Sequence, residues 1–180
     1  ITLMHLKRIP WTLVVILTVA IIANIIWIYL DQSPPLWDIA GHSYRAAATA
    51  RGLDYDSIYP PLSYWVTTVG FLLFSWHSDI PQYSLLFWLG LYCLSVYSIG
   101  LQWFRKSWVA SLAVALSLCY PLLVHFSRIY DLDFPLTALV MLSLATLLRT
   151  QQFSNRLWSL LYGGAVGLTL LTKWTGVVFL

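Results

Sequence analysis

Seven carboxylates are the side chains of this sequence best suited to chemistry, and all seven are aspartates. They stand between long apolar runs and never inside one: Asp31, Asp38, Asp54, Asp56, Asp79, Asp131 and Asp133. A charge placed in lipid costs at least ~2.5–3.5 kcal/mol on insertion scales. Carboxylates between apolar runs therefore mark an aqueous surface, and we expect the chemistry of the chain there.

A predicted helix over residues 36–48 carries Asp38 and His42 four positions apart, hence on one helix face. The helix follows a Pro-Pro pair and ends near Gly52, a residue suited to the position after a helix. The purely structural interpretation is a solvated helix with an Asp–His hydrogen bond. The functional interpretation makes Asp38 a general base and His42 its partner or a metal ligand, although two ligands do not make a metal site.

Further charged residues lie in a later turn and in the last apolar run. The turn holds Arg128, Asp131 and Asp133, which are either ordinary loop charges or part of a site shared with the first segment. Lys173 lies far into the last apolar run, toward its outer end. It either extends outward to the membrane surface or is functional, since an intramembrane ionisable residue is a functional candidate and a lysine suits a phosphate.

The composition indicates an all-α integral membrane protein. Hydrophobic residues make up 59% of the 180 residues, charged residues make up 9%, and the mean hydropathy is +0.75. A soluble domain has roughly 25% charged residues. Because a span needs about 20 residues, five or six crossings use most of the chain and leave a single transmembrane domain over 1–180. The net charge of +3 is small, and the basic residues flank apolar runs, which excludes a nucleic-acid patch.

Five apolar runs are suited to crossing a bilayer: 11–30, about 83–104, 108–126, 134–148 and 157–180. A sixth, 62–76, reaches only about 22 Å, short of the ~30 Å core, and predicts an in-plane or re-entrant helix. With the N-terminus inside, six basic residues stay inside and three lie outside with every aspartate. A rival threading that makes 62–76 a span also counts six against three, but it puts the basic residues near the first span outside. We expect five spans in a helical bundle, with 31–79 as the first extracytoplasmic loop carrying interfacial helices.

Four motifs occur in a recognisable order: Trp37-Asp38 before a helix, a stretch at 59–65 that opens Tyr-Pro-Pro-Leu, Ser-Arg at 127–128 leading to Asp-Phe-Pro-Leu at 133–136, and Leu-Thr-Lys at 171–173. In this order the sequence resembles the N-terminal part of the GT-C membrane glycosyltransferases, in the protein-mannosyltransferase and aminoarabinose-transferase group. The resemblance extends over nearly all of the chain. Because the sequence starts without Met and stops inside an apolar run, we expect a fragment of a longer protein that is inactive alone.

The resemblance implies sugar transfer from a polyprenyl-phosphate carrier to an acceptor at the outer face. Asp38 matches the catalytic aspartate of the first outer loop, and Asp133 matches a second aspartate better than Asp131 does. It also implies that the Pro-Pro-Leu helix lies along the outer surface. Many relatives have an acidic residue directly after the first aspartate. Ile39 occupies that position in this chain, so Asp38 lacks an acidic neighbour and His42 becomes a stronger candidate for a functional residue.

The predicted reaction is an inverting transfer in which Asp38 takes the acceptor proton, a role that contributes about 10²–10⁴-fold. Lys173 is the first candidate to stabilise the leaving phosphate, followed by Arg128 and Arg45. Asp133 orients the acceptor or holds a divalent cation together with His42. Asp131 and Tyr59 complete the predicted substrate-binding residues. The sequence leaves open whether that cation is present and predicts no other cofactor.

The expected partners are the polyprenyl-phosphate-linked donor, the lipid bilayer and an acceptor that is a protein, a lipid or a glycan. We expect a bacterial plasma membrane, with the site on the extracytoplasmic side. Two other classes stay open: a polytopic transporter and a non-catalytic membrane scaffold. Transporters place ionisable groups near the membrane midplane, whereas the charges here gather at one surface, which favours surface chemistry.

Overall fold

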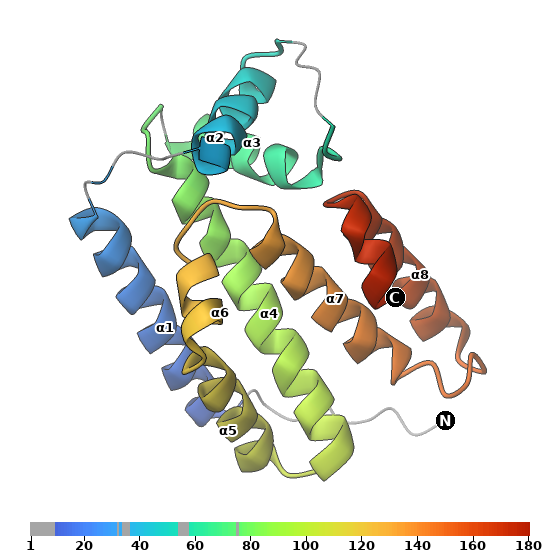
Figure 1. The fold of residues 1–180 in the computed structure, drawn as a ribbon. Helices are drawn as coiled ribbons and strands as arrows, with labels where there is room; N and C mark the ends of the chain where they lie inside the picture. The colour runs from blue at the N-terminus through green and yellow to red at the C-terminus, as the bar shows by residue number, and fades with distance from the viewer. Residues whose placement is uncertain (1–9, 32, 34–36, 54–57, 75) are drawn as a thin grey trace.

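The computed structural model describes residues 10–31, 33, 37–53, 58–74 and 76–180, and within them the chain forms helices and no strand (Figure 1). The all-α prediction is therefore confirmed for the described residues. The helices are α1 (Trp11–Leu30), α2 (Trp37–Ala50), α3 (Leu62–Phe74), α4 (Ile80–Phe104), α5 (Ser107–Leu118), α6 (Pro121–Phe126), α7 (Asp133–Leu147), α8 (Arg156–Leu170) and the 3₁₀ helix η1 (Trp174–Phe179).

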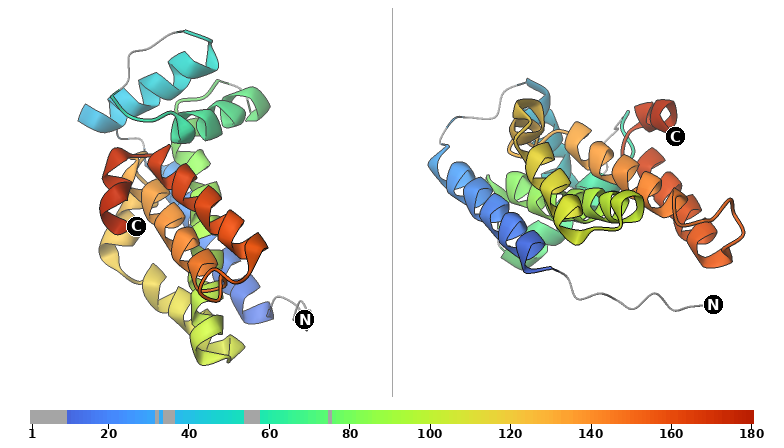
Figure 2. Two further views of the ribbon diagram at one scale, coloured as in Figure 1. Left: turned by 90° about the vertical axis from the view of Figure 1, so that its right-hand side faces the viewer. Right: turned by 90° about the horizontal axis from the view of Figure 1, so that it is seen from below.

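Two helices cross one end of a bundle formed by the others. α1, α4, α5, α7 and α8 run along the bundle, and α2 and α3 lie across its end (Figures 1 and 2). We call this the capped end. α4 is the central helix, in contact with α1, α3, α5 and α7.

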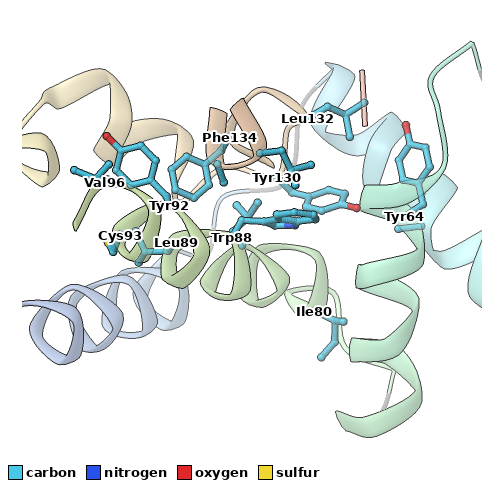
Figure 3. Close-up of a cluster of buried hydrophobic side chains, with 14 of the residues drawn as sticks. Tyr64, Ile80, Trp88, Leu89, Tyr92, Cys93, Val96, Tyr130, Leu132 and Phe134 are labelled. Carbon is cyan, nitrogen blue, oxygen red and sulfur yellow. The ribbon is translucent and has the colours of Figure 1, made fainter. Parts of the chain in front are cut away.

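The core fixes the segment that enters α7. Tyr130 and Leu132 are completely buried and Phe134 nearly so, and all three pack on the α4 face that carries Trp88 and Leu89 (Figure 3). The alternation of buried and less buried residues turns Asp131 and Asp133, the positions between them, away from this core. Burial of three large apolar side chains, at about 1.5–3 kcal/mol each, thus holds both carboxylates in place.

Hydroxyl groups fasten α3 to the bundle. The Thr67 hydroxyl lies 2.8 Å from the Tyr130 hydroxyl and 2.9 Å from that of Ser84 on α4. All of these hydroxyls are at least partly buried, so each needs a partner. The cap is therefore joined both to α4 and to the chain that leads into α7.

Small residues bring α4 and α5 together. A Cβ atom added to Gly100 would lie 3.0 Å from the Ala110 Cα atom, which is tighter than most real Cβ contacts. Small residues at such crossings let helix backbones approach closely, as membrane helices commonly do. The close contact sets the α4–α5 hairpin at the end opposite the cap.

Two helices in the described part of the chain, α1 and α4, are long and apolar enough to cross a membrane. α1 has the predicted bounds, and α4 begins three residues before the predicted run. The other three predicted runs contain shorter helices. The run 108–126 divides into α5 and α6 because Pro121 has no N–H for the helix and holds Tyr120 extended.

The last predicted run also divides. α8 ends at Leu170, and Lys173 has extended backbone angles, φ −157° and ψ 133°, before η1 begins. The expectation that Lys173 lies within one long apolar helix was wrong. It stands in the turn between two helices, at the capped end.

Both predicted surface helices are present. α2 ends before Gly52, which has a left-handed φ of 68°, as expected of a residue after a helix. α3 has 13 residues, a length of about 20 Å. Asp54, Asp56 and the first basic residues lie outside the described residues.

The described aspartates gather at one end of the bundle, together with Arg45, Arg51, Arg128 and Lys173, and four other basic residues lie at the opposite end. Asp31, Asp38, Asp79, Asp131 and Asp133 belong to elements that meet at the capped end, after α1, in α2, before α4 and around the start of α7. The α4–α5 and α7–α8 connections, with Arg105, Lys106, Arg149 and Arg156 in or beside them, lie at the opposite end.

Candidate active site

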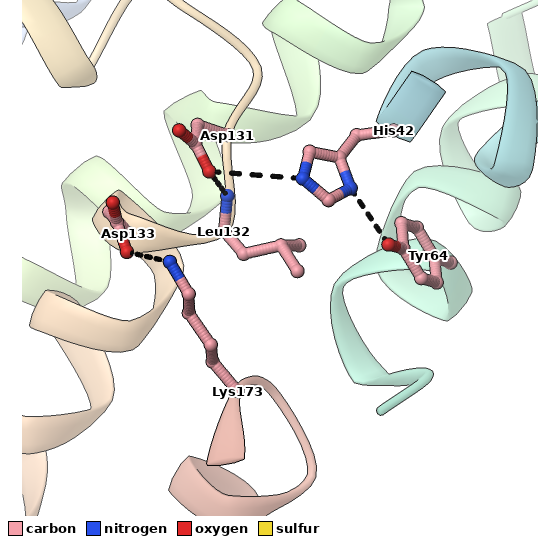
Figure 4. Close-up of polar contacts among 6 residues, drawn as sticks. All are labelled: His42, Tyr64, Asp131, Leu132, Asp133 and Lys173. Atoms are coloured by element: carbon pink, nitrogen blue, oxygen red, sulfur yellow. Dashed lines mark hydrogen bonds and ion pairs between the residues drawn. The ribbon is translucent and has the colours of Figure 1, made fainter. Parts of the chain in front are cut away.

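An ion pair joins two of the predicted site residues, Lys173 and Asp133. The Lys173 ammonium donates a hydrogen bond to the Asp133 carboxylate at the start of α7 (Figure 4). Asp133 lies in the first turn of its helix, where the helix dipole favours an ionised carboxylate. The Lys173 side chain is 20% exposed and that of Asp133 is 43% exposed, so a ligand can reach the pair.

The two most specific sequence motifs touch each other. The Leu62 N–H donates to the Leu171 carbonyl oxygen at 3.0 Å, and the Trp174 indole N–H donates to the Ile58 carbonyl oxygen at 2.8 Å. These bonds bracket the Tyr-Pro-Pro stretch on one side and Lys173 on the other. They fix the start of α3 against the turn that carries the lysine.

Gly176 seats η1 below this turn. A Cβ atom there would lie 2.9 Å from the Thr169 methyl carbon and 3.1 Å from a Leu136 methyl carbon. The Gly176 N–H also donates to the Lys173 carbonyl oxygen at 3.0 Å. A glycine is thus required for η1 to fold back on α8 and α7 and hold Lys173 in place.

His42 is the buried centre of the second half of the site. Only 4% of the residue is exposed, and its Nδ1 atom lies 2.8 Å from the Tyr64 hydroxyl on α3. Its Nε2 atom lies 4.0 Å from an Asp131 carboxylate oxygen (Figure 4). The Tyr59 ring packs edge-on against the imidazole with centroids 5.3 Å apart.

The pKa of His42 is lowered from its ordinary value, mainly because burial disfavours the charged imidazolium. Asp131 and Asp38 oppose this shift, whereas Arg45 and Lys173 add to it. The imidazole is therefore neutral at pH 7, with one nitrogen able to donate and the other able to accept a hydrogen bond. All four of these charges act on His42 through space, and Asp131 is the one with a measured contact to the ring.

The structure does not agree with the purely structural interpretation, which expects a hydrogen bond between Asp38 and His42. Asp38 is exposed in the first turn of α2 and makes no hydrogen bond or ion pair within the described residues. His42, one turn along, pairs with Tyr64 instead. The predicted Asp38–His42 hydrogen bond is not formed, and the Asp38 carboxylate is left open to solvent.

One predicted site residue lies elsewhere. The Arg128 guanidinium stacks on the Trp27 ring of α1, 4.6 Å from its centroid, and has no described contact with His42, Asp133 or Lys173. The other predicted site residues meet at the capped end: Asp38, His42, Arg45, Tyr59, Asp131, Asp133 and Lys173.

Sequence reasoning missed two contributors to this arrangement, Tyr64 and Trp174. Tyr64 falls within the motif at 59–65, but an uncharged residue on an apolar helix carries no signal of its partner. Trp174 directly follows Lys173 and was indistinguishable from the many tryptophans at span ends.

No three His, Cys, Asp or Glu side chains converge on a common point among the described residues. Among the described residues, His42 contacts the carboxylate of Asp131, whereas Asp133 forms an ion pair with Lys173. A divalent cation held by His42 and Asp133 stays a prediction, and these contacts do not support that pair of ligands.

Comparison with known proteins assigns the family. No curated protein and no solved structure is significantly similar to the chain. The family described as dolichyl-phosphate-mannose-protein mannosyltransferase matches residues 59–180. This match is narrower than the resemblance in the sequence, since it includes Asp131, Asp133 and Lys173 but not α2. It covers well over half of the chain, which therefore belongs to the dolichyl-phosphate-mannose-protein mannosyltransferase family of membrane glycosyltransferases, whose donors are polyprenyl-phosphate-linked sugars.

Proposed function

We propose that the capped end is the active site of an inverting glycosyltransferase that works at the extracytoplasmic face of its membrane. The observation that carries the proposal is the Lys173–Asp133 pair. It lies within the family match and is partly open to solvent, and the same end of the bundle carries a neutral His42 and an Asp38 that has no partner among the described residues. This arrangement offers a cation for a phosphate and a carboxylate for a proton.

Asp38 is the proposed general base. Its carboxylate takes the proton of the acceptor hydroxyl while the hydroxyl oxygen forms a bond to the anomeric carbon of the sugar. The bond between that carbon and the carrier phosphate oxygen breaks on the opposite face, and its electron pair leaves with the phosphate. A base must be free to accept the proton, and Asp38 has no partner among the described residues that would have to be displaced.

Lys173 is the proposed phosphate ligand. The negative charge that develops on the leaving phosphate needs a preorganised cation. An ammonium has three donors, so Lys173 can keep its bond to Asp133 and still donate to a phosphate oxygen. In this proposal Asp133 is a positioning residue that aims the lysine, in place of the direct contact with the acceptor expected from the sequence.

His42 and its neighbours are proposed to bind sugar hydroxyls. The 4.0 Å between the His42 Nε2 atom and Asp131 is too long for a direct hydrogen bond. A hydroxyl or a water between them could bond to both. Tyr59 and Arg45, whose guanidinium lies 5.8 Å from the Tyr59 ring centroid, form the adjacent wall.

The proposed topology has five crossings: α1, α4, α5 with α6, α7 and α8. Six basic residues precede α1 or lie in the connections opposite the cap, against four at the capped end (Arg45, Arg51, Arg128 and Lys173), and this excess agrees with the positive-inside rule. The short α3 lies across the bundle, which supports an in-plane helix and argues against the six-span alternative. The capped end is then extracytoplasmic.

The test uses the full-length protein in proteoliposomes with a radiolabelled polyprenyl-phosphate sugar and extracted acceptors. Asp38→Asn should lower transfer by at least 10²-fold, within the range of general base catalysis of about 10²–10⁴. Asp79→Asn is the matched control, since Asp79 is another aspartate of the capped end and should leave transfer unchanged. Full transfer by Asp38→Asn would refute the base assignment. Uptake of the label without transfer would indicate a transporter, and neither activity a scaffold.

A further inference from the structure

An open groove of about 370 Å³ runs along α1, between that helix and the α5–α6 segment. Its volume lies in the range of ligand sites, roughly 300–1,000 Å³. Most of its lining is aliphatic, and its polar residues are confined to Asn24, Ser127 and Arg128. The aliphatic lining residues are Val15, Ile16, Val19, Ala20, Ala23, Ala115, Leu118 and Val124.

The groove runs along the middle of α1. Val15 and Asn24 are nine positions apart on α1, which is about 14 Å along the helix axis. Half of the ~30 Å hydrocarbon core is about 15 Å. Asn24 is six positions and Val15 fifteen positions before the last residue of α1, so the groove extends from about 9 Å to about 22 Å from that helix end and crosses the membrane midplane.

Arg128 places an uncompensated cation at the polar end. Its guanidinium rests on the Trp27 ring, and its Nε atom is buried with no hydrogen-bond partner among the described residues. No carboxylate is among the described residues that line the groove. Asn24 and Ser127 bond to each other at 3.1 Å and offer no charge. An anion at this end would compensate the charge of the guanidinium.

We propose that this groove binds one anionic phospholipid of the surrounding bilayer, with its phosphate on Arg128 and an acyl chain between α1 and α5–α6. The proposal rests on α1 crossing the membrane, and it does not depend on the catalytic roles given above. It adds a lipid site that would help to fix the position of α1 against the bundle, because the helices on which α1 mainly packs are α4 and α5.

The sugar donor is a poorer occupant of this groove. α1 packs on α4 and α5, whereas α8, which leads to Lys173, packs on α7 and η1. The groove therefore lies on the α1 side of α4, whereas the Lys173–Asp133 pair joins α7 to the turn after α8 on the other side of α4 (Figures 1 and 2). A polyprenyl phosphate with its phosphate on Arg128 would hold its sugar on the wrong side of α4.

The test is native mass spectrometry of the full-length protein in mild detergent, with phosphatidylglycerol and phosphatidylcholine added in equal amounts. The wild-type protein should retain one phosphatidylglycerol in preference to phosphatidylcholine. Arg128→Gln should lower this retention by about five- to tenfold, as expected for one basic residue near an anionic phosphate. Arg149→Gln is the matched control, since its guanidinium stacks on Trp158 at 4.5 Å in the same way.

A second variant tests the contribution of the acyl chain to lipid binding separately from that of the head group. Ala23→Phe fills the groove beside its polar end and leaves Arg128 in place, and it should also lower retention of phosphatidylglycerol. Equal retention by the wild-type protein and Arg128→Gln would overturn the proposal. So would unchanged retention by Ala23→Phe, or displacement of the phospholipid by an equal concentration of polyprenyl phosphate, which would make the groove a donor site.

Discussion

Replacing Lys173 by methionine distinguishes a catalytic role of its charge from a merely structural role in the ion pair with Asp133. The substitution keeps the length of the side chain and removes its charge. The pair is partly exposed, with Asp133 at 43%, so water screens it and its loss should cost only about 0.5–1 kcal/mol of unfolding free energy. Asp133 remains solvated after the change and is not left as a buried, unpaired charge.

The effect on catalysis should be much larger. Removing one donor that stabilises a developing oxyanion typically lowers kcat by about 10²–10³-fold, or about 2.7–4 kcal/mol. Lys173→Met should therefore lose at least two orders of magnitude in sugar transfer with almost no loss of stability. Asp133→Asn should lose less, because it leaves the ammonium in place and only weakens its orientation.

Transfer would be measured with full-length protein in proteoliposomes, and stability by thermal unfolding in detergent. Lys106→Met is the control, because Lys106 is an exposed lysine at the opposite end of the bundle. The reversed pair, Lys173→Asp with Asp133→Lys, should recover stability relative to either single change but not transfer. A loss of transfer below about tenfold with an unchanged melting temperature would refute the role of Lys173, since a phosphate ligand is worth more than that.

Three further predictions concern the cap and the bundle. Because burial lowers the pKa of His42 below its ordinary 6.5, the fold favours the neutral imidazole; stability should be full above pH 6.5 and fall below it, and His42→Gln should reduce this dependence in melting curves. Tyr64→Phe removes the hydroxyl that pairs with His42 and should cost about 0.5–1.5 kcal/mol in a denaturant titration; an unchanged midpoint would mean that the bond contributes nothing. Gly90→Ala should stabilise α4 by about 0.5–1 kcal/mol, whereas Gly100→Ala, which meets Ala110, should lose that gain, and equal effects would contradict the close helix contact.

The sequence was most informative where the signal is local. The bounds of α1 follow from a continuous apolar run, and the end of α2 follows from Gly52. The breaks at Pro121 and after Leu170 were obscured because apolar residues continue through both. Hydropathy measures the cost of leaving water and is insensitive to a missing backbone donor, which is what ends a helix at proline.

The sequence predicts most of the residues that form the site, but it does not predict which of them contact one another. The four-residue spacing correctly places Asp38 and His42 on one helix face, yet the partners of His42 come from α3 and from the entry to α7. Spacing along one helix carries no information about the helices that pack on it. Arg128 shows the same limit, since a long side chain in a short turn can reach either neighbour, and it reaches α1.

The family match starts at residue 59 and so divides the site into two parts: Asp133 and Lys173 lie within the match, and Asp38 and His42 lie before it. Tyr59 opens the segment whose Leu62 N–H bonds to the Leu171 carbonyl oxygen, so the matched region contains both Asp133 and Lys173 and this backbone bond beside the lysine. Asp38 and His42 come from α2, outside the match, and reach the site because α2 packs on α3. The proposed base therefore lies on a helix outside the matched region, and that helix is joined to the phosphate-binding half through the Tyr64–His42 contact.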